Sequence, residues 1–411
     1  MSAAIREGIP LFRAATTVTP TLYTSLVVRR LNKVASAFCL LSGPWEHPAA
    51  EGLKERTLLT GGVKNETAVW LIDHSQAYNL WSRMRCLTRY REISSMPCVH
   101  VDPARSDDAL RKLLYSGDVI IKTNLPSVGK FVEFTRHELA VAFAPHDPQH
   151  VHEVLGPAEI ASILAVWKPQ FIHNETSKAL TRAIIIEAGF DPERTHFDVP
   201  KPRTAYPVGH LTTGIAYAFP WHRDTWYGAS QSQINWWFPI WEPKPDNAMA
   251  FDLPSFDRAV PNDSHTLNYY QANKDRLNAA QYVKSDLRAR PGALNWHPAF
   301  EFIPILSPGA IVLFSGSQLH KTIPNTSGLS RYSVDFRTID RLDVEAGVGA
   351  PAHDVNCTGT ALRDFVGVAS GVRIDENLAR QVEGAPPPDD AILVFDSEIA
   401  KQASGIAKSS T

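Results

Sequence analysis

Residues 308–336 have the sequence PGAIVLFSGSQLHKTIPNTSGLSRYSVDF. The runs at 310–314 and 331–339 are typical of β-strands, and a segment rich in Gly, Ser, Asn and Pro joins them. His320 follows the first predicted strand, and Arg331 opens the second. Polar residues at the ends of strands lie where binding sites are commonly built on a β-scaffold. This stretch therefore predicts both a β-rich fold and a candidate site.

The second predicted strand has two different faces. Period-two alternation groups Tyr332, Val334 and Phe336 on one face, and the other face carries Arg331, Ser333, Asp335 and Arg337. An arginine can bind a carboxylate through two parallel charge-assisted hydrogen bonds, and a nearby serine can add a third. An ordinary solvent-facing strand would show the same alternation, so the pattern indicates a carboxylate site only together with His320.

A second polar cluster lies upstream. His222 and Asp224 stand between the apolar runs GIAYAFPW and QINWWFPIW, so the segment HRDTWYG is interpreted as the loop of a strand–loop–strand unit. Two imidazoles and one carboxylate on one face of an octahedron are the ligand set of mononuclear non-haem iron, and they leave the opposite face open. We therefore expect His222, Asp224 and His320 to bind one metal ion.

The His-x-acid spacing alone is a weak signal, because three other pairs share it: His100–Asp102, His173–Glu175 and His196–Asp198. The first pair precedes the predicted core and adjoins a proline, so it is interpreted as a surface turn. The second falls where a helix is expected to begin. The third lies in an extended run with both side chains on one face, and it remains a rival for the metal.

Helices are expected before strands along the chain. The predicted helices are Asp107–Tyr115, Ala158–Trp167 and Lys178–Ala188, and the predicted strands are Asp118–Lys122, Thr195–Val199, Gly214–Phe219, Gln233–Trp241, Ala310–Phe314 and Arg331–Ile339. This order favours an α+β fold with an antiparallel core. We expect a catalytic domain at residues 96–345, an N-terminal extension of unknown role at 1–95 and a C-terminal extension at 346–411.

Composition excludes several classes of protein. The 411 residues are 44% hydrophobic with a formal net charge of −2, which argues against nucleic-acid or membrane-surface binding. No apolar run approaches the roughly 20 residues of a membrane span. The four cysteines show no CxxC pairing, so a reduced, cytoplasmic location is expected. The basic, Ser- and Thr-rich residues 1–45 leave an organellar presequence as the alternative.

The His-x-Asp pair, the distant histidine and the Arg-x-Ser that follows it resemble the Fe(II)/2-oxoglutarate-dependent dioxygenases. The spacing is most similar to the phytanoyl-CoA dioxygenase-like branch, and residues 97–345 carry the likeness. The resemblance implies a double-stranded β-helix core, of jelly-roll or cupin-like type, with flanking helices packed on one sheet. It also implies an enzyme that hydroxylates an unactivated C–H bond of a small-molecule substrate, with 2-oxoglutarate and O₂ converted to succinate and CO₂.

The resemblance also implies roles for individual residues. His222, Asp224 and His320 would hold Fe(II), and Arg331 with Ser333 would bind the distal carboxylate of 2-oxoglutarate. The predicted strand after the metal loop would add co-substrate contacts through Gln233, Asn235 and Trp237, although core packing would explain the same aromatics. Arg337 remains an alternative partner for the co-substrate or for a substrate acid. Trp221, Trp226 and Tyr227 are expected to line the substrate pocket.

Several readings stay open. The presence of Asp224 disfavours halogenation, which needs a small residue at that position. Desaturation or cyclisation would use the same residues as hydroxylation. A metal-dependent isomerase or dioxygenase that does not use 2-oxoglutarate would have no need of Arg331, and a non-catalytic jelly-roll binding module would bind no iron. The sequence identifies neither the substrate nor the oligomeric state.

Overall fold

The computed structural model describes residues 57–63, 66–72, 97–286 and 288–394. Its helices are α3 (Asp107–Tyr115), α4 (Pro126–Phe143), α5 (Pro157–His173), α6 (Glu175–Glu187), α7 (Tyr269–Arg276), α8 (Arg341–Ala346) and α9 (Glu376–Glu383). Its strands are β1 (Thr57–Val63), β2 (Glu66–Ile72), β3 (Val99–Val101), β4 (Val119–Lys122), β5 (Thr195–Phe197), β6 (Lys201–Ala205), β7 (Ile234–Pro239), β8 (Met249–Phe251), β9 (Phe300–Ile305), β10 (Ile311–Ser315), β11 (His320–Thr322), β12 (Arg331–Asp340) and β13 (Val366–Gly367). The predicted presequence lies outside the described residues.

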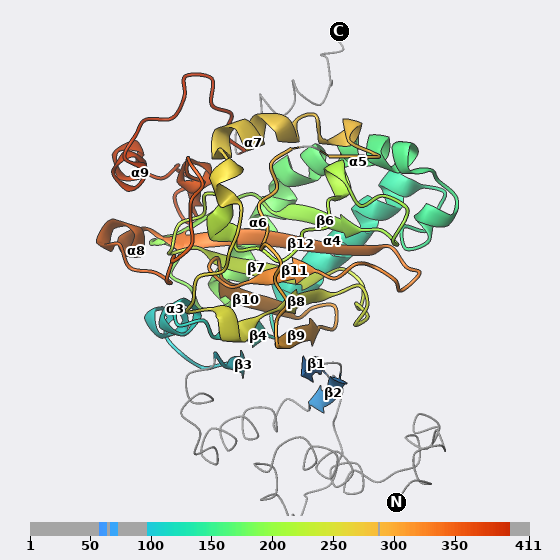
Figure 1. The fold of residues 1–411 in the computed structure, drawn as a ribbon, viewed down its shortest axis with the longest axis horizontal. Helices are drawn as coiled ribbons and strands as arrows, with labels where there is room; N and C mark the ends of the chain where they lie inside the picture. Colours follow the sequence, from blue (N-terminus) through green and yellow to red (C-terminus); the bar gives the residue numbers. More distant parts are fainter. Residues whose placement is uncertain (1–56, 64–65, 73–96, 287, 395–411) are drawn as a thin grey trace, which may run out of the picture. The chain divides into compact units, whose positions relative to one another are not determined.

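The described strands form two sheets. The larger has the order β13-β5-β12-β7-β10-β4-β3, with β6 also paired to β12, and the smaller has the order β11-β8-β9-β1-β2 (Figure 1). All pairings are antiparallel except that of β3 with β4. The predicted α+β fold with a mainly antiparallel core and flanking helices is confirmed at this level.

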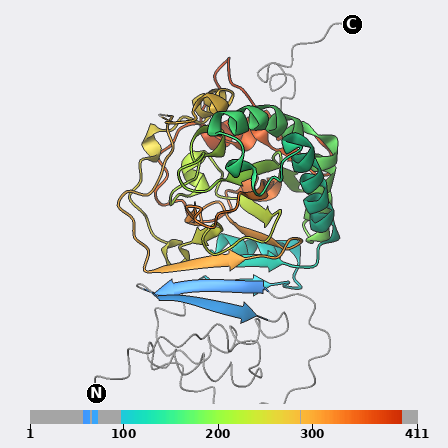
Figure 2. The same ribbon diagram turned by 90° about the vertical axis from the view of Figure 1, so that its right-hand side faces the viewer.

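Alternating side chains on the large sheet separate its two faces. On β10, Ile311 and Leu313 join a core cluster that includes buried residues of α3, α4, α5 and α6. Val312 and Phe314 on the opposite face join a second cluster with Phe251 of β8. One face of the large sheet therefore packs on helices and the other on the smaller sheet. Figure 2 shows the helices of residues 107–187, in teal to green, gathered along one side of the strands.

The faces of β12 follow the predicted alternation. Tyr332, Val334 and Phe336 are fully buried in the helix-side cluster. Arg331 and Arg337 line a cavity on the other side of the strand. The strand thus places its apolar residues in the core and its charged residues in a site.

One local prediction was wrong, and one long helix was missed. The segment Gly214–Phe219 contains a single 3₁₀ turn, Gly214–Ala216, in place of a strand. Gly214 has a φ of +59°, and a Cβ there would lie 2.4 Å from the carbonyl oxygen of Ala279, so the backbone leaves extended geometry where two loops touch. Helix α4, 18 residues long, was not predicted.

Residues outside the predicted catalytic range also enter the sheets. Strand β1 pairs with β9, and β13 pairs with β5. Among the described helices, none is both long and apolar enough to cross a membrane.

Candidate metal centre and co-substrate pocket

A pair of backbone hydrogen bonds brings the two predicted histidine ligands together. The amide of His222 donates to the carbonyl of His320, and the amide of His320 donates back to His222, both at 2.9 Å. His320 begins β11, and His222 lies just before the 3₁₀ turn Asp224–Tyr227. The resulting antiparallel bridge places the two imidazole centroids 4.2 Å apart.

Each imidazole is oriented by a carbonyl two residues before it. Nδ1 of His222 lies 2.8 Å from the oxygen of Pro220, and Nδ1 of His320 lies 2.9 Å from that of Gln318. A carbonyl oxygen only accepts, so both Nδ1 atoms carry the hydrogen and both Nε2 atoms keep a free lone pair. This is the tautomer that a metal-binding histidine needs.

Asp224 completes the cluster. Its Oδ1 lies 3.6 Å from Nε2 of His222 and 3.8 Å from Nε2 of His320. All three ligand atoms lie within 4.8 Å of one another. Bonds of about 2.1 Å at right angles to a shared ion would place such atoms about 3 Å apart. The donor set fits a divalent cation after a small inward movement of the side chains.

The charge states of the three residues also suit a cation. Burial, and then the neighbouring His320, lower the pKa of His222 to about 3. Burial also lowers the pKa of His320. For Asp224, burial acts to raise the pKa, but the positive charge of Arg337 and the neighbouring histidines outweigh it and lower the pKa to about 2. At neutral pH the cluster is therefore two neutral imidazoles and one carboxylate.

The second carboxylate oxygen of Asp224 has partners of its own. Nε2 of Gln233 donates to Oδ2 at 3.2 Å, and the same nitrogen lies 2.8 Å from Oδ1 of Asn235. Nε of Arg337 lies 3.5 Å from Asp224 Oδ2. These contacts hold the carboxylate so that Oδ1 faces the histidines.

Arg331 is a buried cation with spare hydrogen-bonding capacity. Its Nε donates to the carbonyl of Asn247 at 3.0 Å, and its Nη1 donates to Oγ of Ser333 at 2.6 Å. The residue is 7% exposed, and no carboxylate of the described residues forms an ion pair with it, although the charge of Asp335 acts on it from a greater distance. Burial lowers the pKa of Arg331 to about 10, so it remains charged. A buried guanidinium without an ion pair suits a bound carboxylate.

Strand β7 presents its predicted residues to the same cavity. Gln233, just before the strand, and Asn235 and Trp237 within it all line the wall. The guanidinium of Arg331 lies 5.8 Å from the centre of the Trp237 ring. Trp236 is also in the wall, and its ring stacks on Phe336 in the core, with ring centroids 5.2 Å apart. The structure therefore gathers all eight sequence-predicted site residues, although their roles stay predictions.

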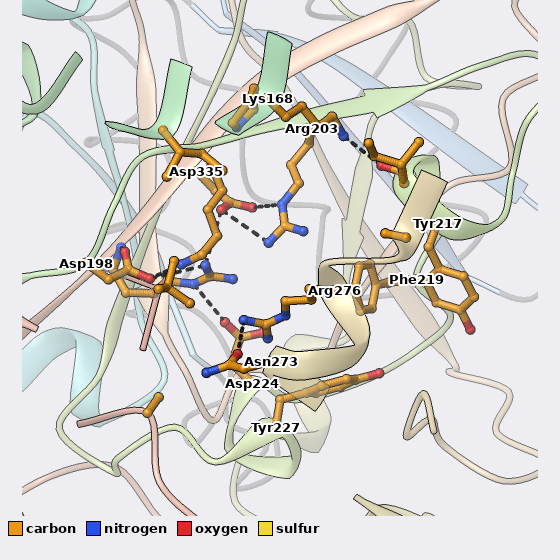
Figure 3. A pocket seen from close by; sticks show the side chains of 18 of the residues that line it. Lys168, Asp198, Arg203, Tyr217, Phe219, Asp224, Tyr227, Asn273, Arg276 and Asp335 are labelled. Carbon is orange, nitrogen blue, oxygen red and sulfur yellow. Dashed lines mark hydrogen bonds and ion pairs between the residues drawn. The ribbon is translucent and has the colours of Figure 1, made fainter. Parts of the chain in front are cut away.

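The cavity that contains the cluster has a volume of about 460 Å³, a size common for small-molecule sites. Its wall includes the three candidate ligands and Arg331, and residues of both sheets. Figure 3 shows Asp224 inside it, with Tyr217, Phe219 and Tyr227 on one side. The pocket has room beyond the metal ligands and Arg331 for further ligand atoms.

Sequence reasoning missed a network of ion pairs in the cavity wall. Arg203 on β6 contacts Asp335 at 2.6 Å. Arg337 lies 3.4 Å from Asp198 and 3.5 Å from Asp335. Strand β6 pairs with β12, with Arg203 opposite Ser333, so the alternation of β12 indicated half of the network. Strand β6 was not predicted, so the sequence did not indicate that Arg203 would be the partner of Asp335. Because Arg337 has three carboxylate neighbours, it is less free than Arg331 to bind a co-substrate.

The rival histidine pairs have other surroundings. His100 contacts Asp118 at 2.7 Å, and the backbone amide of Thr123 donates to Asp102. His173 lines the cavity, but its partner Glu175 does not: it lies in the first turn of α6, as expected. His196 of β5 contacts the carbonyl of Arg194. The carboxyl group of Asp198 does reach the cavity, but His196 is not in its wall.

The predicted aromatic wall is only partly correct. Tyr227 lines the cavity, and its ring lies 5.6 Å from that of His222. Trp226 is fully buried in another cluster and donates from Nε1 to Asp354. Trp221 belongs to the same cluster. The two tryptophans therefore pack in this cluster, and the missed residues Tyr217 and Phe219 line the pocket.

No protein-family model and no curated protein sequence matches the chain. Several solved structures resemble it in part. EvdO2 from Micromonospora carbonacea var. aurantiaca has 14% identity and a TM-score of 0.33, over 54% of this chain and 86% of its own. The epimerase SnoN, in complex with Fe³⁺, α-ketoglutarate and nogalamycin RO, has 11% identity and a TM-score of 0.31, over 57% and 84%. The non-heme monooxygenase ThoJ has 12% identity and a TM-score of 0.26, over 53% and 71%.

Proposed function

We propose that the chain is an Fe(II)- and 2-oxoglutarate-dependent oxygenase that hydroxylates a small molecule, with a catalytic domain at residues 96–345. The observation that carries the proposal is one cavity with two kinds of preformed group. Two imidazoles and a carboxylate are arranged for a cation, and the buried guanidinium of Arg331, which has no direct ion pair among the described residues, is arranged for an anion. An iron ion and an organic diacid together satisfy both.

The two sheets that enclose this cavity correspond, in the proposal, to a double-stranded β-helix. The alternation on β7 and β12 supports this, because each strand presents polar residues to the cavity and apolar residues to the helices. The phytanoyl-CoA dioxygenase-like branch remains our proposal for the subgroup, on the spacing of His222, Asp224, His320 and Arg331.

Ferrous ion with bound 2-oxoglutarate would supply the oxidising chemistry: O₂ gives one oxygen atom to succinate, with release of CO₂, and the other to the C–H bond of the substrate. The protein's own contribution is position. The carbonyls of Pro220 and Gln318 keep the two imidazoles in the metal-binding tautomer, and Gln233 orients Asp224. Arg331 and Ser333 bind the distal carboxylate of 2-oxoglutarate. Phe219 and Tyr227 keep water from the reacting positions.

The direct test is O₂-dependent formation of succinate. Purified protein is loaded with Fe(II) under anaerobic conditions, mixed with 2-oxoglutarate and then exposed to air, with and without a panel of small-molecule substrates. We expect succinate even without the true substrate, as slow uncoupled turnover, and none from His222→Ala. Absence of succinate from the iron-loaded wild type under every condition would contradict the proposal.

The same assay separates the possible outcomes for the substrate. Hydroxylation adds one oxygen atom to a substrate, whereas desaturation removes two hydrogens, so mass spectrometry of the product distinguishes them. Turnover of a substrate that is independent of 2-oxoglutarate would favour a metal-dependent enzyme of another class.

A further inference from the structure

The wall of the cavity carries far more positive than negative charge. Among the described residues, eight lysine and arginine side chains line it, against three carboxylates, Asp198, Asp224 and Asp335. Under the proposed function, the charge of +2 on Fe(II) and that of −2 on 2-oxoglutarate cancel. The excess positive charge of the wall is therefore still present when metal and co-substrate are bound.

Part of this excess is neutralised by pairing. Arg203 and Arg337 contact Asp335, and Lys201 contacts Asp198. Arg288, on the wall, is paired with Asp286 behind it. Arg331 is assigned to 2-oxoglutarate in the proposed function. These assignments leave Lys168, Arg276 and Arg290.

Lys168 of α5 has no carboxylate among the described residues within ion-pair distance, and its Nζ donates to the carbonyl of Ile215 at 2.7 Å. Burial, and then the nearby positive charge of Arg203, lower the pKa of Lys168 to about 7. An anion bound beside this buried amine would favour its protonated form.

Arg276, at the end of α7, is also without an ion pair in the described structure. Its Nη1 donates to Oδ1 of Asn273 at 2.6 Å, and its guanidinium lies 5.8 Å from the centre of the Tyr269 ring. Figure 3 shows Arg276 pointing toward the centre of the pocket and Lys168 next to Arg203. Both side chains retain unused N–H donors.

Arg290 adds a third donor with spare capacity. Its nearest carboxylate oxygen, on Asp286, is 3.8 Å away and already binds Arg288. Its buried Nε has no hydrogen-bond partner. A buried N–H without a partner is unfavourable, and a ligand oxygen would satisfy it. Tyr217 lies beneath this guanidinium, 5.3 Å from it.

We propose that the substrate is an anionic small molecule whose carboxylate or phosphate group is bound by Arg276 and Arg290, with its apolar part against Tyr217, Phe219 and Tyr227. This inference deepens the proposed function, since it names the substrate class of the same site. A positive cavity with low-dielectric walls would also concentrate such anions near the metal. A neutral substrate would leave these cations without partners.

The test measures binding, without turnover, by calorimetry on the full chain with Zn(II) in place of iron and saturating 2-oxoglutarate, which occupies Arg331. The probes are 3-phenylpropanoate, 2-phenylethyl phosphate and the uncharged 3-phenylpropanamide. We expect at least one acid to bind about 10-fold or more tightly than the amide, since a charge-assisted hydrogen bond is worth about that factor. The acid that binds with the higher affinity identifies the recognised group as carboxylate or phosphate.

Single substitutions identify the residues that bind the acid. Arg276→Met and Arg290→Met should each weaken binding of the preferred acid by about 10-fold or more and leave binding of the amide unchanged. Arg276→Lys and Arg290→Lys should retain most of the affinity. Lys130→Met, which removes an exposed lysine of α4, is the matched control and should have no effect. Equal binding of acid and amide, no binding of either acid, or wild-type affinity in both methionine variants would each overturn the inference.

Failure of this inference can be told from failure of the proposed function. The titration is repeated on His222→Ala without metal. Acid binding that persists there and disappears in Arg276→Met supports the anion site, whether or not the protein binds a metal. Succinate formation by iron-loaded protein, measured separately, supports the proposed function whether or not the acid probes bind.

Discussion

The two carboxylate oxygens of Asp224 have different neighbours. Oδ1 faces Nε2 of both histidines, whereas Oδ2 accepts a hydrogen bond from Gln233 and lies near Arg337. The residue therefore links the candidate metal ligands to the charged wall. Its function depends on neighbours that the local sequence does not contain.

Gln233 provides the first prediction at this scale. Gln233→Ala removes the hydrogen bond to Asp224 Oδ2, so the carboxylate is less well oriented toward the metal. We expect Fe(II) affinity to fall about 10- to 100-fold, as is typical for residues that orient a ligand. Competition with a chromophoric chelator measures it. Unchanged affinity would show that Arg337 alone suffices to hold Asp224.

Arg331 provides the second prediction at the scale of single residues. Arg331→Ala should raise the 2-oxoglutarate concentration needed for half-maximal succinate formation by about 10-fold or more, because a buried charge-assisted pair is lost. Iron content should stay near that of the wild type, since Arg331 does not contact the three ligands. Ser333→Ala should give a smaller effect in the same direction. Loss of iron with unchanged 2-oxoglutarate dependence would contradict the assigned role.

At the scale of elements, β12 separates the core from the site. Its even-numbered residues Tyr332, Val334 and Phe336 pack toward the helices, and its odd-numbered residues face the cavity or contact residues there. Strong alternation with a period of two made this strand predictable. Strands β10 and β7 were predicted as apolar runs between turn residues, with boundaries that differ by one or two residues.

Phe336→Ala tests this division. The side chain is fully buried and stacks on Trp236, so its removal leaves a cavity in the core. We expect the free energy of unfolding to fall by about 3–5 kcal/mol in urea titrations. Val141→Ala, at a 65% exposed position of α4, is the control and should change stability by less than about 0.5 kcal/mol. An equally small loss of stability in Phe336→Ala would contradict the conclusion that this side chain is packed in the core.

Elements that were mispredicted or missed had misleading or weak signals in the local sequence. The run Gly214–Phe219 is apolar like a strand, but its aromatic residues Tyr217 and Phe219 face a pocket, and Gly214 turns the backbone against another loop. The cations of the wall come from α5, β6 and α7, which are separate in sequence. Only tertiary packing brings Lys168, Arg203 and Arg276 together, so no motif indicated them. The clustering of His222, Asp224 and His320 was predictable because these residue types and their strand context are specific together.

At the scale of the whole molecule, buried titratable groups couple stability to pH. Burial lowers the pKa of His196 below its ordinary 6.5, and burial also lowers the pKa values of His222 and His320. Below pH 6.5 the unfolded chain takes up protons at these residues, whereas the folded protein does not. Stability that is present above pH 6.5 is therefore lost as the pH falls toward the folded-state pKa values.

His196→Gln tests this coupling away from the metal ligands. In metal-free protein, with a chelator present, the free energy of unfolding should decrease between pH 7.5 and pH 5.5. The decrease should be smaller in His196→Gln than in the wild type, because one proton-binding difference is removed. Urea titrations at the two pH values measure it. An equal decrease in both proteins would show that His196 does not contribute.

The central claim concerns one ion at three atoms. Crystals of the full chain grown anaerobically with Fe(II) and 2-oxoglutarate, measured at the iron absorption edge, locate the metal directly. The account predicts a single anomalous peak in the cavity, about 2.0–2.3 Å from Nε2 of His222, Oδ1 of Asp224 and Nε2 of His320, with the co-substrate extending from it to Arg331. Iron bound at His196 and Asp198 instead, or no iron between these three side chains, would contradict it.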